Sequence, residues 1–406
     1  MRKFLSIILT LICTIVMFSS CAVVNEGKML LSVERQGEYI IRQGECLYQG
    51  GKKVDIQKKI VSKIKKEKKM LGMYVNQGSY ALDYLEKDGE MYFLYCYKRE
   101  VSDVQNQYLN GRHTVNYYAF GKTPFLNPNV TISEYFSLFC EHSEPTTMNA
   151  VGVVGNYVVF EQYKTPFEVL IYDSETLKRQ PIELNGYQVS RIEDNALILW
   201  NEMGNEISLR IFDENLTEYE YTYPKGNKND LFGDYLLISN EKEDTVSGVN
   251  YKTGEELLEE QAKAMFEEET KSKTYPDFIY KGKSYSYERN DAGNNLTEEP
   301  KQLTITIQEM GTDIVYSATY EEVWAIAPAM TQIRKIYQGD FDYCRIFAQD
   351  DELFFAFANW ESFFGMTTKN TSPLLVFKYN EATKQLDYIG WAGTYGGITE
   401  IYKGSL

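Results

Sequence analysis

The most restrictive feature of this 406-residue chain is a turn pattern that recurs every 39 residues. Short polar turns fall at Gly155, Asp194 and Gly233, each between two short apolar segments. A second set of turns, at positions 173, 213 and 252, keeps nearly the same period. Two independent landmarks that share one period are much harder to obtain by chance than simple alternation. The pattern therefore predicts repeated units that can bury their faces only against their neighbours.

Each unit reads as four short strands: strand, turn, strand, polar loop, strand, turn, strand. In the clearest copy, apolar segments 150–154 and 157–161 flank the first turn, and segment 169–173 follows with Thr176 behind it. Looser copies have first turns at 36–37, 87–89, 281–283 and 350–351. The 33 tyrosines and 21 phenylalanines suit half-buried, pleated surfaces. Seven turn anchors predict an all-β chain of seven units, with six or eight left open.

The order strand–turn–strand–loop–strand–Asp-x-x-Thr in residues 150–183 and 344–389 resembles the blades of the WD-repeat-like and quinoprotein-like propeller superfamily. The resemblance implies a β-propeller of seven four-stranded blades with short helical insertions. It implies no activity, because propellers host many unrelated functions. A pair of β-sandwiches would also have short strands and frequent turns, but the constant step argues against it.

We expect the propeller to occupy residues 29–406, with insertions near 49–72, 121–149 and 255–274. Thr253 and Glu256 have the spacing of a capping box, which predicts an acidic helix running towards Glu269. Thr319 and Glu322 predict a second, shorter helix. Insertions decorate the rims of a propeller, where partners bind.

The insertion near 49–72 is rich in lysine. Nine lysines lie between Lys52 and Lys69, and Ile56, Ile60 and Ile64 recur every four residues. This spacing predicts an amphipathic helix with a cationic face. That face could contact anionic lipid head groups or wall polymers, or it could be a solvated surface whose lysines offset an acidic body. The sequence leaves both open.

The first residues predict export and lipid attachment. Arg2 and Lys3 precede the apolar run 4–18, which is too short to span a bilayer but suits a secretory signal. The next residues, Phe18-Ser19-Ser20-Cys21, resemble the lipobox of bacterial lipoproteins. The resemblance implies that residues 1–20 form a signal peptide, with cleavage between Ser20 and Cys21.

The same resemblance implies a diacylglyceryl group on the Cys21 thiol and a tether over residues 21–28. Two acyl chains give stable attachment to a membrane. The protein is then expected at a bacterial cell membrane, facing outside the cytoplasm. An ordinary secretory signal and an uncleaved anchor remain as alternatives.

Composition and spacing exclude several kinds of site. The net charge of −16 argues against a nucleic-acid partner, which normally meets a basic face. Two histidines cannot build a His-rich metal centre, and no Cys-x-x-Cys spacing occurs. Four cysteines lie after Cys21: Cys46, Cys96, Cys140 and Cys344. The sequence does not decide whether they form disulfides or stay as free thiols.

No catalytic motif of a protease, esterase or nucleotide-binding enzyme occurs, so we predict no catalytic, metal or cofactor-binding residue and no cofactor. Weak candidates are His113 for ligand contact, and the acid pairs Asp350-Asp351 and Asp340 with Asp342 for a glycosidase. Four residues could stack on sugar rings: Trp200, Trp324, Trp360 and Trp391.

We therefore predict a non-enzymatic binding or scaffold lipoprotein that presents a propeller face to a protein or glycan of the cell envelope. The alternatives are a carboxylate-dependent propeller enzyme, of the glycosidase or lactonase type, and a carbohydrate-binding lipoprotein.

Overall fold

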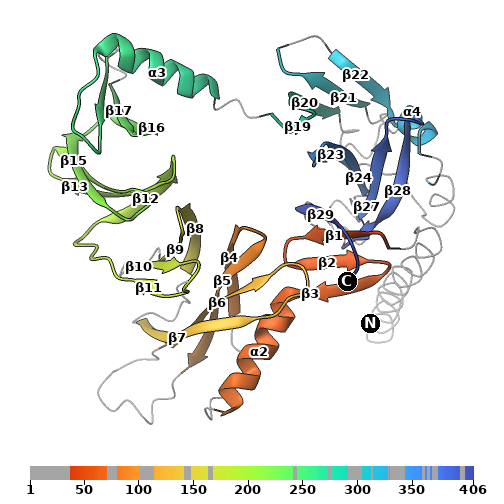
Figure 1. Cartoon of the computed structure of the whole chain (residues 1–406), viewed down its shortest axis with the longest axis horizontal. Coiled ribbons are helices and arrows are strands. Elements are labelled where there is room, and N and C mark those ends of the chain that lie inside the picture. Colours follow the sequence, from red (N-terminus) through yellow and green to blue (C-terminus); the bar gives the residue numbers. More distant parts are fainter. Residues whose placement is uncertain are drawn as a thin grey trace, which may run out of the picture. The chain divides into compact units, whose positions relative to one another are not determined.

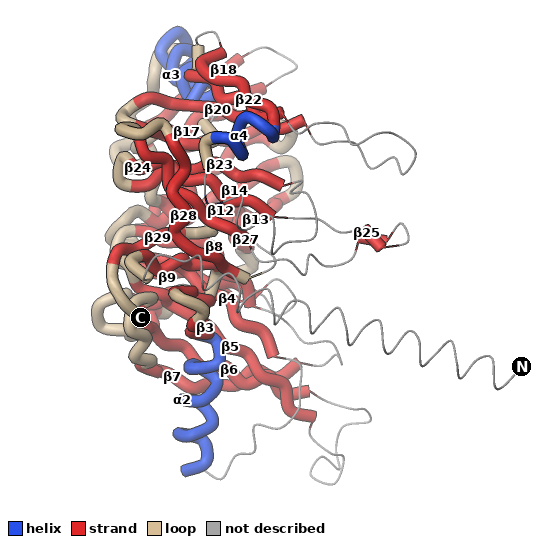
Figure 2. Tube along the Cα trace, turned by 90° about the vertical axis from the view of Figure 1, so that its right-hand side faces the viewer, coloured by secondary structure: helices blue, strands red, loops and turns tan. Residues whose placement is uncertain are grey.

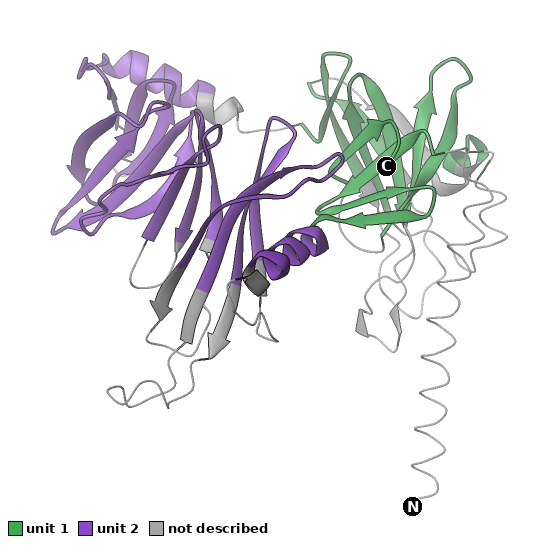
Figure 3. Cartoon of the chain, turned by 60° about the horizontal axis from the view of Figure 1, so that its bottom comes forward, with its two compact units in different colours: residues 1–56, 275–406 green, residues 57–274 purple. Residues whose placement is uncertain are grey.

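A computed structural model of the chain shows an all-β protein with a few helices (Figure 1). Two compact units are distinguished: unit 1, formed by Met1–Ile56 and Tyr275–Leu406, and unit 2, formed by Gln57–Thr274 (Figure 3). The structure describes residues 37–70, 80–100, 114–140, 148–162, 168–240, 245–272, 276–290, 304–311, 314–327, 329, 343–358, 362–363, 366–367, 374–393 and 398–406.

Unit 2 contains four successive antiparallel sheets whose strands follow chain order. They are β4 (Tyr80–Lys87), β5 (Glu90–Glu100), β6 (Thr114–Pro124), β7 (Thr131–Cys140); β8 (Met148–Val154), β9 (Tyr157–Gln162), β10 (Glu168–Asp173), β11 (Arg179–Gln180); β12 (Gln188–Glu193), β13 (Ala196–Met203), β14 (Glu206–Phe212), β15 (Glu218–Pro224); and β16 (Lys228–Phe232), β17 (Tyr235–Asn240), β18 (Thr245–Asn250). Helix α2 (Ile56–Met70) precedes these sheets, and α3 (Glu259–Ser272) follows them.

Unit 1 contains three four-stranded antiparallel sheets and one small ribbon. They are β19 (Phe278–Tyr280), β20 (Lys283–Asn290), β21 (Thr304–Glu309), β22 (Ile314–Thr319); β23 (Tyr343–Gln349), β24 (Glu352–Ala358), β27 (Leu374–Asn380), β28 (Gln385–Ala392); β29 (Glu400–Lys403), β1 (Tyr39–Gln43), β2 (Cys46–Gln49), β3 (Lys52–Asp55); and β25 (Ser362–Phe363) with β26 (Met366–Thr367). The short helix α4 (Tyr320–Ala325) follows β22.

Sheet β8–β11 buries both faces against its neighbours in unit 2, as two alternating sets of side chains show. On β9 and β10, Phe160 and Tyr172 face β5 and β6, and Tyr172 stacks on Phe120 with 3.6 Å between ring centroids. The intervening residues Val159 and Ile171 point the other way and pack against β13 and β14. Because successive side chains of a strand alternate between faces, each central strand joins two cores.

The same stacking recurs within both units. In unit 2 a third core joins sheet β12–β15 to sheet β16–β18, with Ile211 and Leu236 among its buried residues. In unit 1 one core joins sheet β19–β22 to the sheet of β23, β24, β27 and β28, and another joins that sheet to the one containing β1. Successive four-stranded meanders that stack face to face are propeller blades, so the predicted fold class is confirmed. The number of blades remains a prediction.

The sheet that contains β1 differs from the expected first copy. Its first strand is β29, which pairs antiparallel with β1 and brings Ile401 opposite Ile41. The sequence indicated instead a strand at 30–33 with a turn at 36–37. Residues 30–33 lie outside the described part of the chain. Segment 39–41 is the second strand of its sheet, as expected, but its neighbour comes from the far end of the chain.

Two of the expected insertions contain strands of the repeat. The range 121–149 includes β7, which pairs along β6 as the fourth strand of its sheet. The range 49–72 includes β3, which pairs with β2 as a fourth strand, before α2 begins. Both strands carry several polar or charged residues, so they lack the apolar runs that marked the inner strands.

The three predicted helices are confirmed, but Thr253 and Glu256 do not cap the acidic one, because it begins only at Glu259 and Thr253 lies in the turn after β18. In α2, Ile56, Ile60 and Ile64 are fully buried. Helix α4 begins directly after Thr319. Helix α3 begins at Glu259, and the side chain of Gln261 accepts a hydrogen bond from the Leu258 amide at its start.

Candidate functional site

The turns that join first to second strands and third to fourth strands lie at the same edge of each meander, because antiparallel strands alternate in direction. At this turn edge, four turns that follow a third strand share one arrangement. Three of them lead to a fourth strand, and the turn after β18 leads to α3. Their leading side chains are Asp173, Asp213, Asn250 and Asn380.

In each case a side-chain oxygen accepts hydrogen bonds from backbone amides two to four residues ahead. Asp173 Oδ1 accepts from the amides of Glu175 (3.1 Å) and Thr176 (2.6 Å), and also from the Thr176 hydroxyl (2.9 Å). Asn380 Oδ1 accepts in the same way from Ala382 (3.1 Å) and Thr383 (3.3 Å). The Asp-x-x-Thr pattern of the sequence is therefore an Asx turn that ends the third strand. The Thr176 amide bond also lowers the pKa of Asp173.

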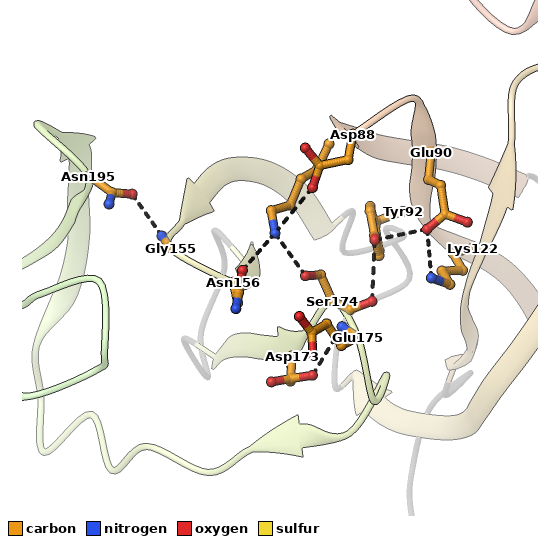
Figure 4. A network of polar contacts seen from close by, with 11 residues as sticks. Asp88, Glu90, Tyr92, Lys122, Gly155, Asn156, Asp173, Ser174, Glu175 and Asn195 are labelled. Atoms are coloured by element: carbon orange, nitrogen blue, oxygen red, sulfur yellow. Dashed lines mark hydrogen bonds and ion pairs between the residues drawn. The ribbon is translucent and has the colours of Figure 1, made fainter.

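A lysine joins two neighbouring sheets at the turn edge of unit 2 (Figure 4). Lys87, at the end of β4, donates to Asn156 Oδ1 at 3.0 Å and to Ser174 Oγ at 3.1 Å. Close by, the Tyr92 hydroxyl donates to Glu90, whose carboxylate also binds Lys122 Nζ at 2.6 Å. The Lys87 contacts connect the turns of sheets β4–β7 and β8–β11, and the Tyr92 hydroxyl also lies 3.3 Å from the Ser174 carbonyl oxygen. Their role is to hold adjacent blades in register.

The 39-residue period has a direct physical basis at this edge. The Gly155 amide donates to Asn195 Oδ1 in the next sheet (2.7 Å; Figure 4), and the Gly233 amide donates to Asp194 Oδ2 (2.6 Å). Gly155 has φ of +53°, and a Cβ there would lie 2.2 Å from the Glu214 carbonyl oxygen. Only glycine fits this approach of one turn to another.

The turn edge of unit 1 is hollowed where turns of its sheets converge. The hollow has a volume of about 480 Å³. Charged and aromatic side chains line it: Glu38, Asp351, Glu352, Glu381 and Asp387, then Lys281 and Lys378, then Tyr39, Tyr280, Tyr379 and Tyr388. Five carboxyl groups against two amines give it an acidic character.

Two of these carboxylates are held ionised by lysines. Burial disfavours the charged form of Glu352, but hydrogen bonds from Lys378 (2.6 Å) and Lys403 (2.9 Å) outweigh it, so its pKa is lowered. The pKa of Glu381 is lowered by hydrogen bonds from Lys281, at 2.7 Å, and from the Tyr280 hydroxyl.

A carboxylic acid that donates a proton in catalysis needs a raised pKa. In the hollow, the pKa of Glu352 and that of Glu381 are lowered, so neither of these two residues suits this role. The described carboxyl whose pKa is raised is Glu161 on β9, where burial disfavours the charged form. Glu161 belongs to unit 2 and is not part of the hollow. The carboxyl groups and tyrosine side chains that line the hollow suit the binding of cationic groups.

One of the candidate site residues singled out from sequence lines the hollow. Asp351, of the pair Asp350-Asp351, lines the hollow. Asp340, Asp342, His113, Ser20 and Cys21 lie outside the described residues. Lys281 of the hollow belongs to the turn at 281–283, which the repeat had marked, and Glu381 follows the end of β27. These turns belong to different sheets, so their convergence depends on how the sheets pack.

The tryptophans and cysteines with described side chains have packing roles. Trp200 packs against the core between sheets β12–β15 and β16–β18. Trp391 packs against the core of unit 1, with its ring centroid 6.3 Å from that of Tyr48. The side chains of Trp324, Trp360 and Cys140 lie outside the description. Cys46 is a half-buried free thiol, and Cys96 and Cys344 are buried in the cores.

Among the residues that the structure describes, no group of three or more His, Cys, Asp or Glu side chains is arranged to hold a metal ion. Within the same residues, no helix is both long enough and apolar enough to cross a membrane.

No protein-family profile matches the chain, and no curated protein matches it in sequence. Among solved structures, it is similar to an acylaminoacyl peptidase of Pyrococcus horikoshii, at 10% identity and a TM-score of 0.27 over 77% of this chain. This chain spans 46% of the length of that peptidase.

Two further solved structures are similar over most of the chain. One is a quinonprotein alcohol dehydrogenase-like protein of Bacteroides thetaiotaomicron, at 10% identity and a TM-score of 0.25, covering 91% of this chain and 78% of that one. The other is the dihydro-heme d1 dehydrogenase NirN, at 8% identity and a TM-score of 0.31, covering 91% and 76%. We take no functional assignment from similarity at this level. The assignment to the propeller class comes from the stacked meanders themselves.

Proposed function

We propose that this protein is a lipoprotein tethered outside the cytoplasmic membrane, whose propeller binds a cationic partner at the hollow of unit 1. The tether is supported by the sequence Phe18-Ser19-Ser20-Cys21 directly after a short apolar run. Binding is supported chiefly by one observation: five carboxyl groups and only two amines line the hollow, and tyrosine side chains lie beside them.

A partner with lysine or arginine side chains fits this chemistry. Ionised carboxylates attract cations, and tyrosine faces add cation–π attraction. Lys281 Nζ already lies 5.5 Å from the centroid of the Tyr280 ring, which shows how an amine can sit there. A protein segment with basic residues therefore suits the hollow better than a neutral glycan, which carries no opposite charge.

The tether is tested by growing cells with a labelled fatty acid. The native chain should incorporate label, and Cys21→Ser should not, because serine has no thiol to alkylate. A Cys13→Ser variant is the matched control and should keep the label, since Cys13 lies within the predicted signal peptide. Equal labelling of the native and Cys21→Ser chains would contradict the lipid attachment.

Binding at the hollow is tested with a fluorescent oligo-arginine peptide and the double variant Glu38→Gln, Asp351→Asn. Both residues are exposed at the hollow, so the variant removes charge without disturbing a buried group. Two exposed ion pairs contribute about 1–2 kcal/mol together, so affinity should fall by roughly 5- to 30-fold.

The matched control for charge is Glu255→Gln with Glu260→Gln, two exposed carboxylates of unit 2. This variant should bind the peptide like the native chain. If both variants lose affinity equally, the peptide responds only to the overall negative charge, and the hollow is not the binding site.

A further inference from the structure

Helix α2 presents a lysine face on the side opposite its buried isoleucines. Figure 2 shows the course of this helix in blue. Residues three, four and seven apart share one face of a helix, so positions 58, 62 and 65 lie together. Four lysines are exposed on this face: Lys58, Lys59, Lys65 and Lys66. Ser62 lies among them and is also exposed, and no aromatic residue occurs in the helix.

The single acid of the helix does not neutralise this face. Glu67 accepts a hydrogen bond from the Tyr135 hydroxyl of β7 at 2.6 Å and pairs with Lys63 Nζ at 3.0 Å. Burial disfavours its charged form, but these two partners prevail and lower the pKa of Glu67. The acid is therefore engaged between helix and sheet, and it fixes α2 beside β7.

The charge of α2 is opposite to that of the chain as a whole. Helix α2 has seven lysines and one acid, Glu67, whereas the whole chain carries a net charge of −16. Lysine is a compact, strongly hydrated point charge on a flexible stem and lacks the planar fork of arginine. A row of lysines therefore suits an extended surface of anionic groups better than a shaped pocket for one ligand.

We propose that the lysine face of α2 adsorbs to a bilayer surface rich in anionic phospholipid. Each lysine close to such a surface contributes about 1 kcal/mol, and the attraction falls off within a Debye length of roughly 10 Å. The absence of aromatic residues in α2 means that the contact is electrostatic and does not insert into the acyl region. The contact does not require the lipid on Cys21, although a tether would hold the helix near the same membrane.

The test uses the chain from residue 22 onward, which contains every described helix and strand but no lipid attachment site. Its partition is measured by flotation with vesicles of phosphatidylcholine, with or without roughly one third phosphatidylglycerol. We expect binding only to the anionic vesicles, and loss of binding in about 1 M salt, where the Debye length is roughly 3 Å.

Replacing Lys58, Lys59, Lys65 and Lys66 by glutamine should lower the partition coefficient by roughly 100-fold or more. The matched control replaces four other exposed lysines by glutamine, which gives the same change in net charge: Lys178, Lys225, Lys228 and Lys384. The control should lower the partition coefficient by less than about threefold, because these lysines lie outside the proposed contact. Circular dichroism of both variants checks that α2 and the sheets are retained.

Equal loss in the two variants would overturn the proposal, and so would equal binding of the native chain to neutral and anionic vesicles. Binding to soluble inorganic polyphosphate without binding to vesicles would assign the face to an anionic polymer and also overturn it. Because the test chain lacks Cys21, failure here is distinct from failure of the lipid tether, which fatty-acid labelling reports.

Discussion

Arg210 on β14 is a buried cation held by oxygen acceptors and ring faces within unit 2. Its side chain is 6% exposed, its Nε donates to the Glu218 carboxylate, and its Nη1 donates to the Glu183 carbonyl. The guanidinium carbon lies 5.3 Å from the ring centroids of both Tyr187 and Phe212. The hydrogen bond with Glu218 raises the pKa of Arg210 and lowers that of Glu218. A buried charge satisfied in this way stabilises the fold only while its partners are present.

We expect Arg210→Ala to lower the free energy of unfolding by about 2–3 kcal/mol, because it leaves acceptors unpaired and opens space beside two rings. Arg210→Lys keeps the positive charge but loses the planar guanidinium group, so it should lower the free energy of unfolding by less than Arg210→Ala does. Urea unfolding followed by tryptophan fluorescence measures both.

The control for this prediction is Arg179→Ala. Arg179 is more exposed than Arg210. Its Nη2 lies 4.0 Å from Glu168 Oε2, and its guanidinium carbon lies 5.9 Å from the centroid of the Phe136 ring. Arg179→Ala should lower the free energy of unfolding by less than about 1 kcal/mol. Equal destabilisation by the two alanine variants would show that buried Arg210 stabilises the fold no more than an exposed arginine does.

At the scale of elements, β29 is held to its sheet by more than its ladder with β1. The Gln349 side chain donates to the Ile401 carbonyl at 2.7 Å and accepts from the Ile401 amide at 2.8 Å. The Gln49 side chain donates to the Gly404 carbonyl at 2.6 Å and accepts from the Leu406 amide, also at 2.6 Å. The side-chain amides of Gln349 and Gln49 thus hydrogen-bond the backbone of residues 401–406 in the way that a neighbouring strand would.

We predict that Gln349→Ala weakens the attachment of β29 by about 1–2 kcal/mol, since two hydrogen bonds to one backbone residue are lost. Amide hydrogen exchange of residues 400–403 should speed up by roughly 5- to 30-fold, because this segment opens locally. Exchange in sheets of unit 2 should not change.

Gln385→Ala is the control, because Gln385 is exposed at the start of β28. It should leave exchange in β29 unchanged. Unchanged exchange in Gln349→Ala would mean that the ladder with β1 alone retains the strand.

At the scale of the whole molecule, both units contain carboxyl groups whose pKa is lowered by hydrogen bonds. Asp173 and Glu218 belong to unit 2, and Glu352 to unit 1. A group with a lowered folded pKa adds stability above its unfolded pKa, and this stability disappears as pH falls through the folded value. Buried tyrosines behave in the opposite direction. Burial, and to a smaller extent the nearby Glu90 carboxylate, raises the pKa of Tyr92 to about 12. Their contribution is present below the unfolded pKa and is lost as pH rises through the folded value.

The melting temperature should therefore stay nearly constant between the ordinary pKa of glutamate, 4.5, and that of tyrosine, 10.0, and fall on both sides. Calorimetry at constant ionic strength measures this profile. A melting temperature that rises steadily as pH falls below 4.5 would contradict it.

Asp173→Asn isolates one contribution to the acid limb. Asn250 and Asn380 already form the same turn with an amide oxygen, so the variant should keep the turn and lose its titration. The fall in stability below the ordinary aspartate value of 3.8 should become less steep in this variant. An unchanged slope would show that other carboxyl groups account for the acid limb.

Several strands and turns could be predicted because their signals are local. Segments 150–154 and 157–161 alternate between two buried faces, and Gly155 between them is the residue that a close turn requires. The buried isoleucines of α2 were predictable for the same reason, since a spacing of four places them on one face. β7 escaped prediction because its residues include Ser133, Glu134 and Ser137, which weaken the apolar signal of a strand.

The hollow of unit 1 could be predicted only in part. Asp351 was singled out as one of two adjacent acids, yet its neighbours in the hollow come from segments far along the chain, such as Glu38 and Glu381. The acidic turns were visible, but not which lysine would face which carboxylate. The ion pairs of Glu352 with Lys403 and of Glu381 with Lys281 join different sheets, so they depend on packing between sheets.

The sequence by itself determined the period of the repeat, the strand–turn alternation within each copy, and the polarity of the faces of α2. These follow from the backbone geometry and side-chain chemistry of a few consecutive residues. Only the tertiary structure decided that β29 joins β1 and that the turns of unit 1 enclose an acidic hollow. Both features depend on contacts between residues distant in the chain, and such contacts form only when stacked sheets bring them together.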